Sequence, residues 1–394
     1  MEQSSMEKKL QSINDLLPLE LIEEIFLRIP IKHLARLRFV SKLWNTLISD
    51  PHFAKSHLDH SLAPSHTCLF LQDKSQAYSV DLDALLHDNT RAISPIYKKA
   101  PPVYHLLGSC RGFVLLHGKP QFLIQWNPLT GSSKTISYSH IDNTATSNGE
   151  FFALLYGFGY DASQDDYVVV VAYKGKDGKN HFDLCCLGSN SWINLDAELP
   201  KSLNLSKLKP YGVFCNGAIH WSTYGVLDAI LVFDLKERNF SKIEAIKRDM
   251  FRPGIVQLGG CLALYLYSYV EDKTEIWVMK EYKVQSSWTL LCVIPLNFFK
   301  ALCLSANGDI IGRCRPSNNE IVFYIYNVSG VLLKYVWYRY SVLPNRIQFV
   351  VHANSLMAVS SSIKDKKMKK GCQNQKEVKQ GNGNRGKQEN NLDT

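Results

Sequence analysis

The chain has 394 residues, of which 45% are hydrophobic and 21% charged, an ordinary composition for folded protein and enough for two or three domains. No apolar run approaches the roughly 18 residues that span a bilayer, and the first 15 residues lack the apolar core of a secretory signal. We therefore expect no membrane partner, a cytoplasmic or nuclear location, and reduced cysteines.

The formal charge of +9 is unevenly placed. Residues 364–394 hold nine basic and four acidic side chains, so +5 belongs to this segment and only +4 to the rest. Such a weak field over the remaining chain does not indicate a nucleic-acid partner. We expect residues 1–13 to be flexible and residues 361–394 to be a disordered basic tail, in which "KKMKK" (366–370) is a candidate nuclear import signal.

The segment 14–60 predicts a small all-α unit. Apolar residues recur at helical spacing between Pro18 and Pro30, and residues 31–40 and 41–49 predict a second and a third helix, which "DP" at 50–51 ends. Three helices in about 35 residues seldom bury a complete core by themselves. Either the remainder of the chain or a second protein must cover the apolar face, and the spacing leaves both explanations open.

The stretch "LPLELIEEIFLRIPIKHLARLRFVSKLWNTLISDPHF" (17–53) resembles an F-box of the plant type. The resemblance implies docking to a Skp-type adaptor, and through it to a cullin, a RING subunit and the ubiquitin-transfer machinery. Carried over by position, it implies that the adaptor-binding residues, some of which support the three-helix core instead, are Leu17, Pro18, Ile25, Val40 and Trp44.

Residues 61–360 predict a large all-β domain, because short apolar runs alternate there with Gly, Pro, Asn and Asp turns. Five loosely repeated units, each with three apolar strands, start at Gly112, Gly159, Gly217, Gly260 and Gly308. The spacing suits the four-stranded blades of an irregular, kelch-like β-propeller, with residues 66–110 and the last strands as candidates for a sixth blade. A two-sheet β-sandwich is the alternative.

Several ordered blocks of this region resemble the F-box-associated domain of plant F-box proteins, often called the F-box/kelch type. They include "LLGSCRGFVLL" (106–116), "WNPLTG" (126–131), "YGFGYDASQDDYVVV" (156–170) and "GVFCNGAIHW" (212–221). The paired glycines of true kelch repeats are mostly missing, so the kelch label describes architecture rather than ancestry. The resemblance implies a protein-interaction domain.

No catalytic pattern is indicated: the chain lacks G-x-S-x-G, H-E-x-x-H and G-x-x-x-x-G-K-[ST]. The group His52, His57, His60, His66 and Cys68 matches no familiar ligand spacing. We therefore expect a non-catalytic protein without a cofactor or a metal. A glycoside hydrolase propeller is a distant alternative, since it needs a carboxylate pair that nothing in the sequence marks. Five tryptophans near strands, at 126, 192, 221, 277 and 288, predict blade packing rather than ligand platforms.

The leading hypothesis is the substrate-recognition subunit of a Skp–cullin–F-box ubiquitin ligase, whose β domain binds an unidentified target. The alternative is a non-degradative protein that sequesters a partner. Equivalent loops of successive blades emerge on one face, so the target surface is predicted on five variable loops, 117–121, 174–180, 222–228, 268–274 and 314–320. The candidate target-binding residues are Tyr224, Asp228, Tyr269, Glu271 and Arg315, and the aromatic run "YVWYRY" (335–340) is a second candidate surface.

Overall fold

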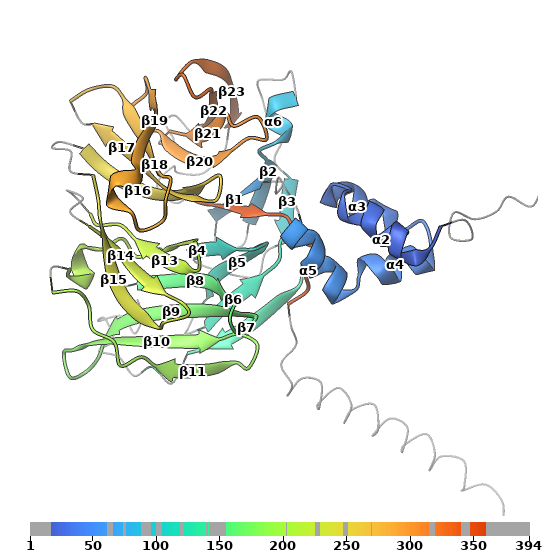
Figure 1. Cartoon of the computed structure of the whole chain (residues 1–394), viewed down its shortest axis with the longest axis horizontal. Helices are drawn as coiled ribbons and strands as arrows, with labels where there is room; N and C mark the ends of the chain where they lie inside the picture. The colour runs from blue at the N-terminus through green and yellow to red at the C-terminus, as the bar shows by residue number, and fades with distance from the viewer. Residues whose placement is uncertain are drawn as a thin grey trace, which may run out of the picture.

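The structure is a computed structural model in which a helical unit (residues 17–60) lies against one end of a β-propeller (Figure 1). The residues that it describes are 17–60, 66–73, 76–87, 96–99, 105–118, 122–138, 141, 155–201, 203–224, 229–246, 251–268, 270–314, 320–339 and 347–359.

The helical unit contains the three predicted helices and a fourth that was not predicted. Asp50 Oδ1 accepts hydrogen bonds from the backbone N–H groups of His52 (2.8 Å) and Phe53 (3.1 Å), and Pro51 occupies the first helical position, where its missing N–H is not needed. The Asp-Pro pair therefore ends one helix and starts another. The helices are α2 (Leu19–Leu27), α3 (Ile31–Leu37), α4 (Lys42–Ile48) and α5 (Pro51–His60).

This unit has a core of its own. Ile22, Phe26, Leu34, Ile48 and Phe53 are each at most 3% exposed and pack into one cluster. The fourth helix supplies Phe53, whose ring stands edge-on to that of Phe26 at 6.5 Å. The added helix explains how so short a segment fills its interior.

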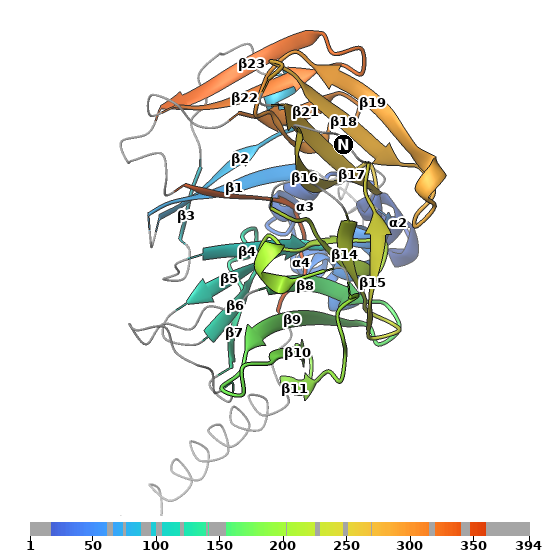
Figure 2. The same cartoon turned by 90° about the vertical axis from the view of Figure 1, so that its left-hand side faces the viewer.

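The β domain is a propeller of six four-stranded antiparallel sheets, which confirms the predicted architecture and the sixth blade and rules out the two-sheet alternative. Figure 2 shows the sheets arranged around a central axis, with the helical unit behind them. A short helix, α6 (Ala84–His87), follows the second strand. Blades 1 to 3 comprise β24 (Gln348–Ala353), β1 (His66–Asp73), β2 (Gln76–Asp81) and β3 (Ile96–Lys99); β4 (His105–Cys110), β5 (Phe113–Gly118), β6 (Phe122–Trp126) and β7 (Ser133–Ser137); and β8 (Leu155–Asp161), β9 (Asp166–Lys174), β10 (Asn180–Cys186) and β11 (Ser191–Asn194).

Blades 4 to 6 follow the same order, with the strand nearest the axis first. Two short 3-10 helices, η1 (Leu205–Lys207) and η2 (Gln285–Ser287), lie between strands. The strands are β12 (Val213–Cys215), β13 (Ala218–Trp221), β14 (Ala229–Asp234) and β15 (Asn239–Glu244); β16 (Phe251–Leu258), β17 (Cys261–Ser268), β18 (Thr274–Met279) and β19 (Trp288–Ile294); and β20 (Lys300–Leu304), β21 (Ile310–Arg313), β22 (Glu320–Tyr326) and β23 (Leu332–Arg339).

The repeat predicted from glycines is correct for four blades and shifted in one. Gly112, Gly217, Gly260 and Gly308 lie in the turn between the first and second strands, each with a positive φ. Gly159 instead lies inside β8, and Asp165, with φ 51°, occupies the turn of that blade. The predicted units therefore contain the last three strands of each blade, except in blade 3, where the unit includes part of the innermost strand.

The two ends of the propeller join in blade 1. Strand β24 pairs with β1 from His66↔Ala353 to Leu71↔Gln348, so the last strand of the chain is the innermost strand of the first blade. This pairing closes the ring and removes an exposed sheet edge.

The blade cores explain the continuous apolar runs. Both faces of an inner strand are covered by neighbouring blades, so successive residues pack into different cores. In β9, Val169 and Val171 join the cluster between blades 2 and 3, and Val168 and Val170 join that between blades 3 and 4. The five tryptophans predicted to pack the blades belong to, or pack against, these clusters: Trp126, Trp192, Trp221, Trp277 and Trp288.

Strand direction divides the propeller into two faces. Because neighbouring strands are antiparallel, the turns between first and second strands emerge at one end, and the loops between second and third strands emerge at the other. We call these ends the helical-unit face and the loop face. The connections between blades also lie on the loop face.

Candidate functional site

The helical unit keeps a large apolar face exposed although its own core is filled. In Figure 1, α5 lies beside the propeller and α2 to α4 lie farther out. The exposed fractions are 44% for Leu19, 51% for Leu21, 47% for Ile25, 91% for Phe39, 61% for Val40 and 41% for Leu43. Neither the core of the unit nor the described part of the propeller covers these side chains.

The structure separates the five predicted adaptor-binding residues into two groups. Ile25 and Val40 belong to the exposed apolar face, and Pro18 is exposed just before α2. Leu17 and Trp44 are partly buried against the core cluster, and the Trp44 ring meets that of Phe26 edge-on at 5.0 Å.

Four further residues of this face were not among the predicted adaptor-binding residues: Leu19, Leu21, Phe39 and Leu43. Leu21 could have been found, because it lies four residues before Ile25 and so on the same side of α2. Phe39 follows the end of α3, where helical spacing gives no direction.

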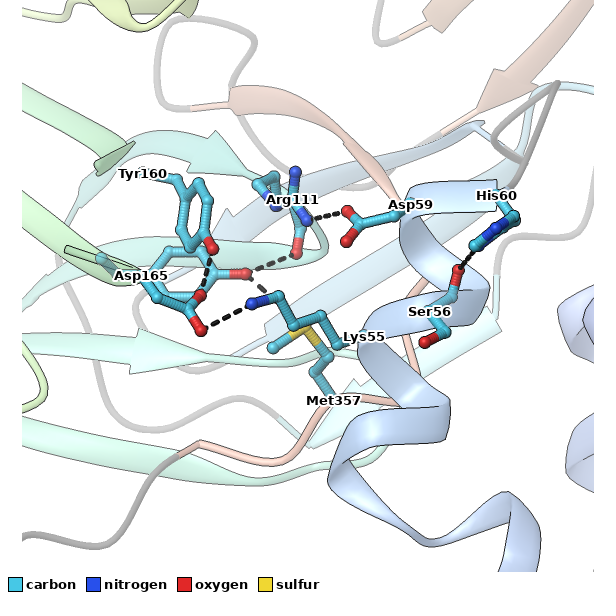
Figure 3. Close-up of polar contacts among 9 residues, drawn as sticks. Lys55, Ser56, Asp59, His60, Arg111, Tyr160, Asp165 and Met357 are labelled. Carbon is cyan, nitrogen blue, oxygen red and sulfur yellow. Dashed lines mark hydrogen bonds and ion pairs between the residues drawn. The ribbon is translucent and has the colours of Figure 1, made fainter. Parts of the chain in front are cut away.

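One side of α5 is fastened to the helical-unit face (Figure 3). The Lys55 ammonium lies 2.5 Å from the Asp165 carboxylate, which also accepts a hydrogen bond from the Tyr160 hydroxyl. One turn later, Asp59 pairs with the Arg111 guanidinium, whose carbon lies 4.4 Å from the centre of the Tyr160 ring. The two contacts connect one helix to the first turns of blades 2 and 3.

These charges fix an orientation more than they stabilise the fold. The hydrogen bonds from Lys55 and Tyr160 lower the pKa of Asp165, and the bond to Asp165 raises the pKa of Lys55. Both side chains are more than a third exposed, so water screens the pair, and about 1 kcal/mol is an upper value for its contribution.

The segment after β24 contacts both units. The Asn127 side-chain amide donates to the backbone carbonyls of Ser355 (2.9 Å) and Met357 (2.7 Å), and its oxygen accepts from the N–H groups of residues 129 and 130. Leu356, between the two anchored carbonyls, packs against the core of the helical unit. Asn127 is the second residue of the block "WNPLTG", so this block anchors a connection that its sequence does not reveal.

Gly112 makes room for this segment. Its φ is +87°, and a Cβ there would lie 2.1 Å from the Cβ of Ser355. A side chain would therefore be strained by the backbone conformation and would displace the segment.

The five variable loops occupy equivalent places. Each connects the second and third strands of its blade, so all five belong to the loop face, at the end of the propeller opposite the helical unit. Among the candidate target-binding residues, Tyr224 is 56% exposed, and Glu271 is exposed and pairs with Lys273. Asp228, Tyr269 and Arg315 lie outside the described residues.

The ends of two of these loops belong to the blades. Ser222, Thr223, Ser268 and Thr274 are at most 7% exposed. The Ser268 hydroxyl accepts from the N–H groups of residues 270 and 271, which bends the loop. In the described part of these two loops, Tyr224, Val270, Glu271 and Asp272 are therefore the exposed residues.

The side chains of the aromatic run "YVWYRY" alternate between two sides of β23, the outermost strand of blade 6, and Tyr340 lies outside the described residues. Tyr335 and Trp337 line a cavity of about 310 Å³, whereas Tyr338 packs against a blade core. Val322 pairs with Trp337, and Tyr324 packs against the cluster between blades 5 and 6, so the cavity lies on the face of β22 and β23 opposite the core residues Ile321 and Phe323. Its lining residues are Glu320, Val322, Tyr324, Leu332, Tyr335 and Trp337.

Within the described ranges, no helix is both long and apolar enough to cross a membrane, and no group of three His, Cys, Asp or Glu side chains could hold a metal ion. Among the histidines considered for a metal, His57 forms a 2.9 Å hydrogen bond with the Ile29 carbonyl and His60 one of 2.8 Å with the Ser56 carbonyl. Both hydrogen bonds therefore lie within the helical unit.

Comparison with known families and proteins agrees with this arrangement. Residues 68–358 match the F-box associated beta propeller domain, and residues 15–56 match the F-box domain. The chain is 31% identical over 303 residues to the F-box protein CPR1 of Arabidopsis thaliana, covering 69% of this chain and 71% of that protein. It is 28% identical over 362 residues to the F-box/kelch-repeat protein At3g23880 of the same plant, covering 84% and 96%. The chain therefore belongs to the family of plant F-box proteins that carry an F-box-associated β-propeller domain.

Proposed function

We propose that this chain is the substrate-recognition subunit of a Skp–cullin–F-box ubiquitin ligase. The helical unit binds a Skp-type adaptor, which connects the chain to a cullin and a RING subunit. The loop face of the propeller binds the target protein. The ligase performs the covalent chemistry in its other subunits, and we propose none for this chain.

The observation that carries the adaptor assignment is the exposed apolar face of α2, α4 and the end of α3. Contiguous apolar surface on a unit with a filled core is typical of a protein interface. Phe39 at 91% and Val40 at 61% exposure are not covered by any of the described residues, and the propeller contacts α5 instead, so this face is open to a second molecule.

The arrangement of the two surfaces supports the receptor role. The loop face and the exposed apolar face of the helical unit lie at opposite ends of the molecule. Between these two surfaces, the contacts of Lys55 and Asp59 hold helix α5 against the propeller. A target on the loop face therefore leaves the adaptor surface free.

The test is co-purification of a plant Skp-type adaptor with the full chain. We expect wild type to retain the adaptor and Ile25→Ser with Val40→Ser to lose it at least tenfold, which is about 1.4 kcal/mol. Leu333→Ser, which removes a 51% exposed apolar side chain from the propeller, is the matched control and should retain it. Equal retention by all three proteins would contradict the assignment.

A second measurement separates the receptor from the sequestering alternative. The adaptor-bound chain is supplied with the cullin, the RING subunit and ubiquitin together with a captured target. Ubiquitin transfer to the target supports the receptor. Stable capture of a target without transfer to it would favour sequestration.

A further inference from the structure

Basic side chains of blades 4 to 6 lie at the loop face, near the central axis of the propeller. Lys209 lies in the connection that leads into β12, and Arg252 is the second residue of β16. Lys300 and Arg313 are paired in register where β20 begins and β21 ends. Starts of first strands and ends of second strands both lie at this face, so the four residues surround the same end of the axis.

Arg313 is a buried cation without a carboxylate. It is 9% exposed, and its guanidinium carbon lies 3.7 Å from the centre of the Phe349 ring. One terminal nitrogen donates to the Cys314 carbonyl at 3.3 Å, and the buried Nε has no hydrogen-bond partner. In the described part of the chain, no Asp or Glu forms an ion pair with it. The ring and one carbonyl leave the charge uncompensated.

Lys209, which is partly buried, is a second cation for which the described residues provide no carboxylate. Its ammonium donates to the Pro253 carbonyl, and no carboxylate of the described residues pairs with it. Burial, followed by the nearby charge of Arg252, lowers the pKa of Lys209 to about 8. Among the described residues, no carboxylate therefore pairs with Lys209 or with Arg313.

The two cations lie near neighbouring residues of β16 and β17 in blade 5. Lys209 contacts Pro253, and the next residue, Gly254, is in register with Tyr265, whose ring fills the space where a Cβ of Gly254 would lie. Tyr265 in turn lies close enough to Arg313 for its phenol to interact with that charge. Lys209 therefore approaches from blade 4 and Arg313 from blade 6.

Two exposed tyrosines adjoin Lys209. Tyr211 is 42% and Tyr224 56% exposed, and the two lie close enough for their phenols to interact electrostatically. The backbone N–H of Tyr224 donates to the Lys207 carbonyl at 2.6 Å, which holds this tyrosine beside the segment that carries Lys209. Aromatic side chains next to cations are a frequent recognition chemistry.

We propose that Lys209 and Arg313, with Tyr211 and Tyr224 beside them, form a binding site for an acidic segment of the target protein. Glutamate or aspartate carboxylates of that segment pair with the two cations, and an adjacent apolar side chain packs on the tyrosines. The inference rests on the proposed function, which places the target on the loop face, and it adds the chemistry of the target.

The surroundings favour a short acidic peptide over a nucleic acid. The chain outside residues 364–394 carries only +4, and Glu271 and Asp272 are exposed on the neighbouring loop of blade 5. A polyanion would bring a continuous run of phosphates against these carboxylates, whereas a short peptide brings only one or two acidic side chains.

The experiment selects peptides from a random 12-residue library on the immobilised full chain. We expect enrichment of Asp and Glu, and the strongest peptide should bind at least tenfold tighter than its Glu→Gln, Asp→Asn counterpart in fluorescence anisotropy. Arg313→Gln and Lys209→Met should each reduce this ratio to about twofold. Lys174→Met is the matched control, because Lys174 ends the second strand of blade 3 as Arg313 ends that of blade 6, and it is exposed.

The proposal is overturned if the selected peptides show no acidic enrichment, or if both variants melt like wild type and keep the ratio. Binding that requires phosphoserine in place of Glu would overturn it in favour of a phosphate site. Should Arg313→Gln not fold, Lys209→Met and Arg313→Lys provide the comparison. Adaptor binding is measured in the same preparations. Failure of wild type to bind the adaptor counts against the proposed function. If the adaptor is bound, a negative peptide result contradicts only the acidic-segment binding site.

Discussion

The Lys55 ammonium lies 2.5 Å from the Asp165 carboxylate, a contact that joins helix α5 to blade 3 across 110 residues of sequence. Asp59, one turn further along α5, pairs with Arg111 in blade 2. Two contacts on one side of a helix prevent it from rotating about its axis. The helical unit therefore has a fixed orientation on the propeller. The distance from its exposed apolar face to the loop face is fixed as well.

We expect Lys55→Met with Asp59→Asn to loosen this orientation without unfolding the chain. Exposed ion pairs contribute about 1 kcal/mol or less each, so the melting temperature should change little. Hydrogen exchange in α5 should accelerate, and ubiquitin transfer to a bound target should fall while adaptor affinity stays within about twofold. Lys242→Met with Glu244→Gln, an exposed pair on β15, is the control. Unchanged protection of α5 would show that the pairs do not fix the helix.

Substitutions in the helical unit should separate folding from adaptor binding. Trp44→Ala removes a ring that packs on Phe26 and should lower the free energy of unfolding by about 2–3 kcal/mol. Phe39→Ser changes a side chain that is 91% exposed, so stability should stay within about 0.5 kcal/mol while adaptor affinity falls. Denaturant unfolding and adaptor titration on the same proteins measure both. A stable Trp44→Ala that loses the adaptor would instead assign Trp44 to the interface.

The end of the chain should be dispensable and the strand before it essential. A protein ending at residue 363 should melt within about 2 °C of the full chain, because a segment of that composition cannot bury enough apolar surface to order itself. A protein ending at residue 346 lacks β24 and leaves β1, with its buried Cys68 and Leu69, as an open edge. We expect it to lose cooperative unfolding. A large fall in melting temperature for the longer protein would contradict the first expectation.

Loop tips, rather than whole loops, should carry target capture. Replacing 224–228 and 269–273 by Gly/Ser of equal length keeps the buried Ser222, Thr223, Ser268 and Thr274 in place. We expect capture of the targets bound by the full chain to fall at least tenfold, about 1.4 kcal/mol, with adaptor binding and melting temperature retained. The control is Lys236→Gln with Glu237→Gln, in the turn of blade 4 on the helical-unit face. Capture that survives the loop replacement would move the target site to another surface, with the Tyr335–Trp337 cavity as the next to test.

His220 should make the chain acid-sensitive. It is fully buried between the Val213 carbonyl (3.2 Å) and the Tyr282 hydroxyl (2.9 Å), and burial lowers its pKa from 6.5 to about 4. The unfolded chain therefore binds a proton first, so this contribution to stability is complete above pH 6.5 and is lost as the pH falls toward 4.

The full loss amounts to about 3 kcal/mol, at up to about 1.4 kcal/mol per pH unit. Urea unfolding of wild type and His220→Gln at pH 7, 5.5 and 4.5 measures it, since the variant should lose this part of the slope. Equal slopes for the two proteins would show that other groups cause the acid sensitivity.

Local patterns predicted most of the elements. Helical spacing and Pro18 and Pro30 located α2 and α3, because side chains that face one core recur at the period of the helix. The four glycines at first turns marked their blades, because those turns need positive φ. Blade 3 has Asp165 at this position instead of glycine. Glycine spacing therefore marked Gly159, which lies inside β8, and the predicted unit begins one strand too early. Helix α5 was missed because Asp50-Pro51 was interpreted only as a stop.

The order of the two domains, the strand content and the apolar character of the helical unit could be predicted from local patterns, since these depend on neighbours within about ten residues. Which side chains of that unit remain exposed depends on long-range packing: Phe39 is exposed, whereas Trp44 packs on Phe26. Long-range packing also decided that β24 completes blade 1, that Leu356 joins the helical core, and that Lys209, before blade 4, contacts Pro253 of blade 5. Each of these contacts joins residues distant in sequence. Their proximity follows from closing a ring of blades, and no local pattern records it.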